Sequence, residues 1–304
     1  MTEHSAGVLC CPVCGADMEA AEKILYCTGE RKHCYDIASS GYINLLPPGK
    51  ASNAKTGDDR RMLRARSAFL DTGAYEKFSA EAARLIKEQL DGAGAKNSTG
   101  SLKENSAVFV DAGCGEGYHT LNIARCLAEH GISPVSVGLE ASKYGAEKAA
   151  KRAKAAGDIG KGSVFAAANI FAMPLKSGCA DAVVSMFAPV PDAEAARVLK
   201  DGGFLIVCSS GSRHLWELRQ VLYGEPRLSP PLSRVPEGFE LCAVSSCSFR
   251  LELQSREEIG ALFEMTPFFF RCPREGRERL MSLDRLSVGA EAEYKVYKKA
   301  YNSI

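Results

Sequence analysis

The sequence predicts an α/β fold: a doubly wound, mostly parallel, Rossmann-like sheet with a small zinc-binding domain at its N-terminus. Three observations predict it. Short apolar segments alternate with helical patterns between residues 107 and 209, as in parallel strands joined by crossover helices. A glycine-rich turn follows the first of these segments. Cysteines and a histidine with the spacing of metal ligands lie among the first 34 residues.

Length and composition set the broad class. The chain has 304 residues, of which 46% are hydrophobic and 25% charged, as in a globular protein with one catalytic domain and a small appendage. No run approaches the ~18 apolar residues of a membrane span. Met1–Leu9 has neither the basic start nor the apolar run of a signal peptide, so we expect a cytoplasmic protein. The net charge of +1 means that any surface for nucleic acid must be local.

The N-terminal domain is organised around thiols and an imidazole. Cys11 and Cys14 are separated by two residues, and Cys27 and His33 follow. This Cys3His set has the spacing of structural zinc sites, and zinc would supply folding energy that a segment of ~40 residues lacks. Cys34 adjoins His33 and is an alternative fourth ligand, and reduced thiols without metal are the other interpretation. Four protein ligands leave no open position, so we expect a structural zinc.

Between this domain and the sheet lies a connector. Pro47-Pro48-Gly49 marks a break, and a helical pattern runs from about residue 60 to residue 90, with Asp58 as its N-cap. The stretch 91–106 is rich in Gly, Ser, Asn and Lys, which predicts a flexible linker. The expected parts are therefore a zinc-binding module (1–48), a helical connector with linker (49–106) and a catalytic domain (107–304).

The catalytic domain is expected to contain five strands and three helices before residue 210, followed by two alternating runs that suit an antiparallel edge. The strands are expected at 107–112, 134–139, 163–168, 182–187 and 203–209. The helices are expected at 119–130, 142–156 and 192–199, and the alternating runs at 239–244 and 247–253.

The glycine-rich turn carries the chemistry. Gly113, Gly115 and Gly117 follow a strand and open a helix, so the backbone can turn tightly and approach a ligand. The pattern G-x-G-x-G after Asp111 differs from the G-x-G-x-x-G of dinucleotide sites. It resembles the first motif of class I S-adenosylmethionine-dependent methyltransferases, in which the acidic residue can hold the cationic end of the cofactor. Glu140, which ends the second strand, can accept protons from ribose hydroxyls. The alternative is a simple tight turn with Glu140 as an N-cap.

Further segments extend this similarity along the chain. They are Gly41–Pro47 (Gly-Tyr-Ile-Asn-Leu-Leu-Pro), Ala65–Tyr75, Asp111–Tyr118, Ala188-Pro189, Gly211–Leu218 and Met265–Phe268. With the order of cysteines and histidine, they make nearly the whole chain resemble the 23S rRNA (guanine-N1)-methyltransferases. Three departures are an acidic residue longer by one methylene at Glu140, a longer loop between Cys27 and His33, and an expanded linker at residues 91–106.

The resemblance implies both cofactors and partners. It implies methylation of N1 of a guanine in a hairpin loop of 23S rRNA, with S-adenosylmethionine as methyl donor and a zinc module that helps recognise the RNA. It also implies a homodimer. The residues that it places against the cofactor are Tyr75, Gly115, Glu116, Glu140 and His214.

The residue that removes the proton of guanine N1 is not identified by the sequence. Methyl transfer requires mainly in-line alignment, but guanine N1 must lose its proton. Asp192 and Glu194 follow the fourth strand, where substrates are often addressed, yet they suit the start of a helix better. Asp181 is expected to begin that strand. The catalytic base is therefore left unassigned.

Two clusters have two interpretations each. Arg60, Arg61, Arg64 and Arg66 suit either phosphate contacts or a solvated helix face. Phe268–Phe270 could stack a flipped base, although we expect at least two of these rings to pack in the core. A small-molecule methyltransferase with a structural zinc module is the alternative function.

Overall fold

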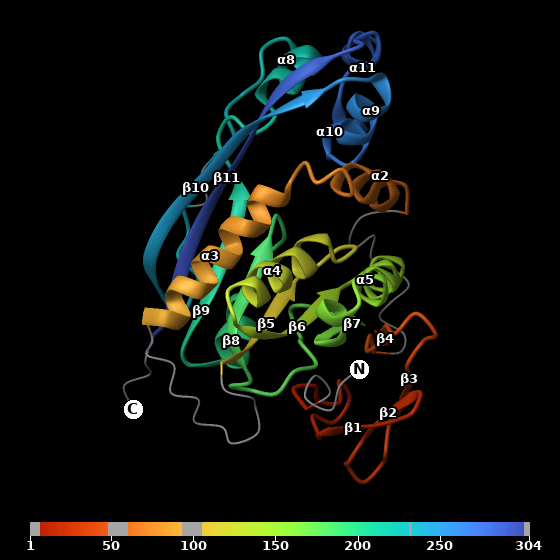
Figure 1. Ribbon diagram of the computed structural model, residues 1–304, viewed down its shortest axis with the longest axis vertical. Coiled ribbons are helices and arrows are strands. Elements are labelled where there is room, and N and C mark those ends of the chain that lie inside the picture. The colour runs from red at the N-terminus through yellow and green to blue at the C-terminus, as the bar shows by residue number, and fades with distance from the viewer. Residues whose placement is uncertain (1–6, 48–59, 93–104, 231–232, 301–304) are drawn as a thin grey trace.

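The N-terminal module is a small antiparallel sheet with long loops (Figure 1). The computed structural model describes residues 7–47, 60–92, 105–230 and 233–300. In the module, strands β1 (Met18–Ala21), β2 (Ile24–Cys27) and β3 (Cys34–Asp36) pair in that order. The proposed N-cap Asp58 and most of the predicted linker at 91–106 lie outside the described residues.

One eight-stranded sheet forms the body of the molecule, in the order β10-β11-β9-β8-β5-β6-β7-β4. Neighbours from β9 to β4 are parallel, whereas β11 pairs antiparallel with both β9 and β10. The predicted mostly parallel sheet is therefore confirmed. The strands are β4 (Ile43–Asn44), β5 (Ser106–Ala112), β6 (Ser133–Glu140), β7 (Ser163–Ala167), β8 (Ala180–Met186), β9 (Leu199–Ser210), β10 (Phe239–Leu253) and β11 (Leu286–Lys299).

Helices α3 and α4 cover one face of this sheet, and the N-terminal module and α7 cover the other. Alternate residues of β5 divide between two cores: Phe109 packs with α3 and α4, and Val110 packs with the N-terminal module and α7. The helices are α2 (Arg60–Leu70), α3 (Glu76–Gly92), α4 (Tyr118–Glu129), α5 (Lys143–Ala155), α6 (Asp158–Lys161), α7 (Asp192–Val198), α8 (Trp216–Tyr223), α9 (Arg256–Glu264), α10 (Phe268–Arg271) and α11 (Arg274–Met281). None of the described helices is long and apolar enough to cross a membrane.

Two predicted elements need correction. The continuous helix over residues 60–90 is two helices, because a turn separates α2 from α3 and Gly73 adopts a φ of +81° there. The alternating runs at 239–244 and 247–253 are one strand, β10, with a register shift between Leu241 and Ala243. Strand β11 and helices α8–α11 were not predicted.

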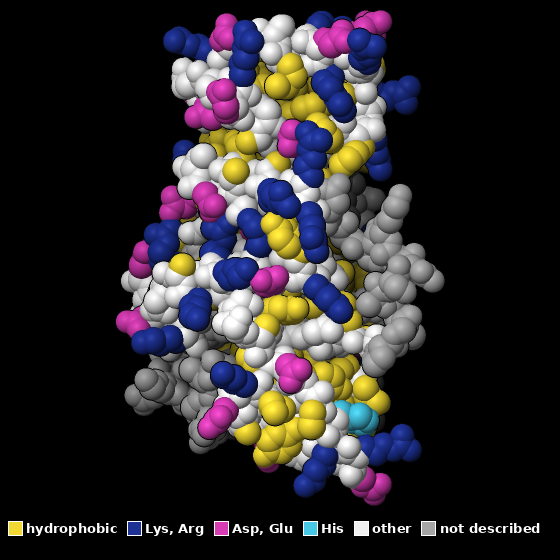
Figure 2. Space-filling model, turned by 90° about the vertical axis from the view of Figure 1, so that its right-hand side faces the viewer, with side chains coloured by type: hydrophobic (Ala, Val, Ile, Leu, Met, Phe, Trp, Pro, Cys, Tyr) yellow, Lys and Arg dark blue, Asp and Glu magenta, His cyan; other side chains and the backbone are white. Residues whose placement is uncertain are grey.

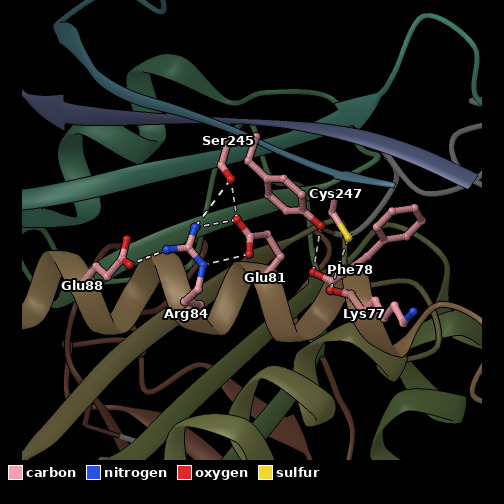
Figure 3. Close-up of polar contacts among 8 residues, drawn as sticks. Lys77, Phe78, Glu81, Arg84, Glu88, Ser245 and Cys247 are labelled. Atoms are coloured by element: carbon pink, nitrogen blue, oxygen red, sulfur yellow. Dashed lines mark hydrogen bonds and ion pairs between the residues drawn. The ribbon is translucent and has the colours of Figure 1, made fainter. Parts of the chain in front are cut away.

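Side-chain hydrogen bonds attach α3 to strands β10 and β11 (Figure 3). The Arg84 guanidinium pairs with both oxygens of Glu81, at 2.6 and 2.8 Å, and the Ser245 hydroxyl of β10 donates to Glu81. The Tyr294 hydroxyl of β11 donates to the backbone oxygen of Phe78 over 2.8 Å. These bonds hold the start of α3 in place, and Tyr75 lies directly before it.

Candidate active site and metal centre

The glycine-rich turn after β5 accepts only glycine at two points. Gly113 has a φ of +89°, and a Cβ there would come within 2.7 Å of the Cβ of Ala188. Gly117 has a φ of +81°, and a Cβ there would meet the Cβ of Ala149 at 2.8 Å. Both the left-handed backbone and the close neighbours exclude a side chain. The turn therefore passes unusually close to the segment after β8.

A cavity of about 510 Å³ opens beside this turn, at the carboxyl ends of the parallel strands. This is the place where open α/β sheets bind their ligands. Seven of the eight residues predicted to bind the cofactor line it: Tyr75, Asp111, Gly113, Gly115, Glu116, Glu140 and His214. The eighth, Gly117, does not line the cavity but packs against α5 at Ala149.

Asp111 presents a buried oxygen that lacks a partner. Its Oδ2 accepts a hydrogen bond from the Thr120 hydroxyl at 2.6 Å, while Oδ1 has no partner among the described residues. Burial raises the pKa of Asp111 to about 7, and the nearby charges of Glu116 and Glu140 add to this effect. A buried acceptor without a partner is costly, so the site is prepared for a donor that a ligand brings.

Glu140 is held by the backbone of the same region. Its Oε2 accepts from the N–H of Gly115 at 3.1 Å, and its Oε1 accepts from the N–H of Ser142 at 2.8 Å. Glu140 also lines the cavity, and a carboxylate oxygen can accept a hydrogen bond from a ligand hydroxyl. Glu116 is also buried, and burial raises its pKa. The cavity thus has one acidic end.

Tyr75 and His214 form a hydrogen-bonded pair in the cavity wall. The backbone N–H of Glu291 donates to Nδ1 of His214 over 3.0 Å, so Nδ1 is unprotonated and the ring proton is assigned to Nε2. Nε2 lies 3.3 Å from the Tyr75 hydroxyl and donates to it. Burial lowers the pKa of His214 to about 4 and keeps the ring neutral. The hydroxyl proton of Tyr75 is therefore available to another acceptor.

The lining residues that the sequence reasoning missed include a buried histidine and a phenylalanine with a strained backbone. His119 lies in the cavity wall, where its Nδ1 is 2.8 Å from the hydroxyl of Ser79 and burial lowers its pKa to about 3. Phe187, directly after β8, has a φ of +54°, which costs on the order of 1–3 kcal/mol for a non-glycine residue. Its ring lies 6.1 Å from that of His119. Strain of this kind is concentrated at functional sites, but neither feature leaves a local sequence pattern.

The acidic residues around the fourth strand have structural roles. Asp181 accepts from the N–H of Val108 and pairs with Lys200, both at 2.8 Å. At the start of α7, Asp192 pairs with Arg234. Glu194 pairs with Arg197 and accepts from the backbone of Met173. None of these three carboxylates lines the cavity, so the structural interpretation is supported.

Some residues of the Phe268–Phe270 cluster and of the α2 arginines line the cavity, and the others have structural contacts or are exposed. Phe268 and Phe269 pack against the core and Phe270 is exposed, as expected for at least two of the three. Phe268 also lines the cavity. On α2, Arg66 lines the cavity, whereas Arg61 pairs with Glu264 over 2.6 Å.

The metal-binding cluster in the N-terminal module has the dimensions of a zinc site. The ligand atoms of Cys11, Cys14, Cys27 and His33 all lie within 4.8 Å of one another. The Cys14 and Cys27 sulfurs are 3.7 Å apart, and Nδ1 of His33 is 3.5 Å from the sulfurs of Cys11 and Cys27. Tetrahedral zinc with bonds of about 2.3 Å to sulfur and 2.0–2.1 Å to nitrogen requires edges of about 3.8 and 3.5 Å. Cys34 is not in the group and is exposed, with its sulfur 3.2 Å from the Lys32 oxygen.

The fold and the site together define a class of protein. A parallel sheet with a G-x-G-x-G turn and an acidic cavity end suits the cationic, ribose-containing S-adenosylmethionine, and residues 103–238 match the family model described as a methyltransferase domain. This is an S-adenosylmethionine-dependent class I methyltransferase with a zinc-binding N-terminal module. Residues 9–52 match the zinc-ribbon model described as "RlmA, N-terminal".

Curated relatives identify the family. YxjB of Bacillus subtilis, named provisionally as a 23S rRNA (guanine-N1)-methyltransferase, is 31% identical over 271 residues, or 87% of this chain and 88% of its own. A protein of Micromonospora griseorubida with the same provisional name is 32% identical over 84% of this chain and 85% of its own. The 23S rRNA (guanine(748)-N1)-methyltransferase of Streptomyces fradiae is 31% identical over 73% and 70%. The chain belongs to the 23S rRNA (guanine-N1)-methyltransferase family, as its sequence predicts.

Proposed function

We propose that this protein transfers a methyl group from S-adenosylmethionine to N1 of a guanine in a hairpin loop of 23S ribosomal RNA. The observation that carries the proposal is the match to relatives of this name over both the zinc module and the catalytic domain. A small-molecule methyltransferase would not need the N-terminal module. We place the activity in the cytoplasm, where ribosomal RNA is made in bacteria.

The chain's own groups suit the cofactor, which supplies an electrophilic methyl group on a sulfonium. We assign the ammonium group of the cofactor to Oδ1 of Asp111 and the ribose hydroxyls to Glu140. Gly113, Gly115 and Gly117 keep the turn open, and Glu116 adds negative charge at the same end. Tyr75, oriented by His214, donates its hydroxyl proton within the cavity. These residues act by binding and aligning, which is the main requirement of methyl transfer.

The RNA is expected to contact a local basic surface. Figure 2 shows Lys and Arg side chains spread over the face of the molecule that includes α2 and α5, with fewer acidic side chains among them. Helix α5 carries Lys143, Lys148, Lys151 and Lys154, whereas its Arg152 pairs with Asp71. Such a surface can neutralise phosphates even though the net charge is only +1.

The remaining assignments concern organisation. We assign a structural zinc ion to Cys11, Cys14, Cys27 and His33, in a module spanning residues 1–48 that helps recognise the RNA. Residues 49–106 connect it to the catalytic domain, residues 107–304. We further propose that two copies form a homodimer, which light scattering of the zinc-loaded protein would detect as twice the mass of 32.6 kDa.

The test is methyl transfer from labelled S-adenosylmethionine to unmodified 23S rRNA, with the product mapped by reverse transcription. A methyl group at N1 blocks base pairing, so a single new stop at a guanine is expected. Asp111→Asn should give no stop. The proposal fails if a folded, zinc-loaded, cofactor-binding protein modifies neither naked rRNA nor ribosomal particles.

A further inference from the structure

A second pocket, of about 430 Å³, adjoins the methyl-transfer cavity. The two share a wall, because Pro267 and Phe268 line both. The rest of the second pocket is formed by α8, the loop after it, and Arg271 of α10: Arg219, Tyr223, Glu225, Pro226, Arg227 and Arg271. None of these six residues lines the methyl-transfer cavity. A ligand group in the second pocket would therefore lie one aromatic ring away from that cavity.

The chemistry of the pocket is set by a buried arginine. Arg219 is only 8% exposed, and its guanidinium group packs on the rings of Trp216 and Phe268, at 5.5 and 5.9 Å. It donates to the hydroxyl of Ser229 over 3.3 Å and to the backbone oxygen of Arg227. Because a guanidinium has five N–H donors, several remain for a ligand.

Arg219 has no carboxylate partner among the described residues. Burial lowers its pKa, as expected for a charged group with little access to water. Removing a charge from water without pairing it is costly. The two neutral acceptors explain how Arg219 anchors the loop after α8, but they do not neutralise its charge. An anionic ligand would.

Two more arginines reinforce this charge. Arg227 and Arg271 also line the pocket, and neither forms an ion pair within the described part of the chain. Three arginines and one glutamate, Glu225, give the lining a net charge of +2. Guanidinium groups match the geometry of phosphate oxygens and bind them in bidentate fashion.

We propose that this arginine pocket binds a backbone phosphate of the RNA next to the nucleotide whose base enters the methyl-transfer cavity. The inference rests on the proposed function, since it takes the RNA as the source of the phosphate. The shared Phe268 wall places the phosphate site and the cavity on either side of one ring. The pocket then holds the RNA backbone while the target base lies in the methyl-transfer cavity.

The test compares RNA binding by Arg227→Ala, Arg271→Ala and a control, Arg256→Ala. Arg256 is exposed and paired with Asp284, so this control removes the same charge outside the pocket. Affinity for a 23S rRNA hairpin is measured at several salt concentrations. Each pocket variant should bind about tenfold more weakly, and the slope of log affinity against log salt should fall by about 0.7–0.9. The control should match the wild type.

Two further measurements separate the possible failures. A hairpin with a neutral methylphosphonate beside the target guanine should bind the wild type about tenfold more weakly, and it should weaken binding by Arg271→Ala by a smaller factor, because that variant has already lost one contact to the phosphate. The affinity for S-adenosylmethionine should be equal in all variants. If the wild type neither binds nor methylates RNA, the proposed function fails and this inference falls with it. If the wild type methylates RNA and the pocket variants keep its affinity and salt slope, only this inference is overturned.

Discussion

The hydroxyl of Tyr75 lies 3.3 Å from Nε2 of His214, although 139 positions separate the two residues in the chain. The contact joins the turn before α3 to the segment after β9. Since Glu291 fixes the tautomer of His214, the direction of the hydrogen bond follows: His214 donates and Tyr75 accepts. The hydroxyl proton of Tyr75 is therefore not used by His214 and can be donated to a ligand in the cavity.

The first prediction concerns this proton. Tyr75→Phe should bind S-adenosylmethionine about fivefold more weakly, because one neutral hydrogen bond contributes about 1 kcal/mol. Calorimetric titration measures the affinity. Tyr297→Phe is the matched control, since it removes a hydroxyl that donates to the backbone oxygen of Arg234 over 3.4 Å, outside the cavity. The control should lose stability but keep cofactor affinity; equal affinities for both variants and the wild type would contradict the assignment.

The second prediction uses the pKa of Asp111. Folding raises this pKa from 3.8 to about 7, so the wild type loses stability as pH rises from the unfolded value through the folded one. Asp111→Asn cannot ionise. The cofactor-free variant should therefore be more stable than the wild type by on the order of 1–4 kcal/mol at pH 8, and by less at pH 5.

Thermal unfolding at both pH values measures this difference. The same variant should lose affinity for S-adenosylmethionine, because the amide carries no charge to pair with the ammonium group of the cofactor. A stability difference that does not change with pH would contradict the raised pKa of Asp111.

The third prediction concerns the metal centre. Cys14→Ser should lose stoichiometric zinc, and the N-terminal module should unfold because metal binding supplies its folding free energy. Cys34→Ser is the control, since Cys34 is exposed outside the cluster. Zinc content by mass spectrometry distinguishes the two. If Cys14→Ser kept its zinc and Cys34→Ser lost it, Cys34 and not Cys14 would be the zinc ligand.

The fourth prediction compares two glycines with similar backbones. Gly113 and Gly131 have φ values of +89° and +78°, but only at Gly113 would a Cβ meet another atom within 4 Å. Both alanine variants should be destabilised by about 1 kcal/mol from backbone strain. Gly113→Ala should lose more stability and should also lose cofactor binding. If both variants bind S-adenosylmethionine like the wild type, the turn does not contact the cofactor.

The elements that the sequence predicted well are those with local signals. Strands β5 to β8 are short runs of mostly buried residues. Ser142 caps α5 by accepting from the N–H of Gly145. Strand β11 was not predicted, although Val288, Ala290 and Ala292 alternate with more exposed residues there. The break at Gly73 was overlooked because its flanks have one continuous helical pattern.

The missed parts of the site depend on long-range packing. His119 faces the cavity with Ser79 of α3 beside it, and Phe187 takes its strained backbone where β8 meets the turn containing Gly113. Neither arrangement has a period or spacing in the sequence. By contrast, Asp111, the glycines and Glu140 are placed by the ends of adjacent strands, so their convergence could be predicted.

Strand β4 fixes the position of the zinc module on the eight-stranded sheet. Ile43 and Asn44 pair with Ala166 and Ala167 at the end of β7, and the chain beyond β7 enters the cavity wall at Asn169. The zinc module is thus joined by backbone hydrogen bonds to the sheet edge that contributes to the cavity wall, and its position relative to the cavity is fixed by this pairing. An RNA hairpin that binds the module and places its guanine in the cavity must span the fixed distance between them. The protein would therefore select hairpins by their dimensions as well as by their sequence.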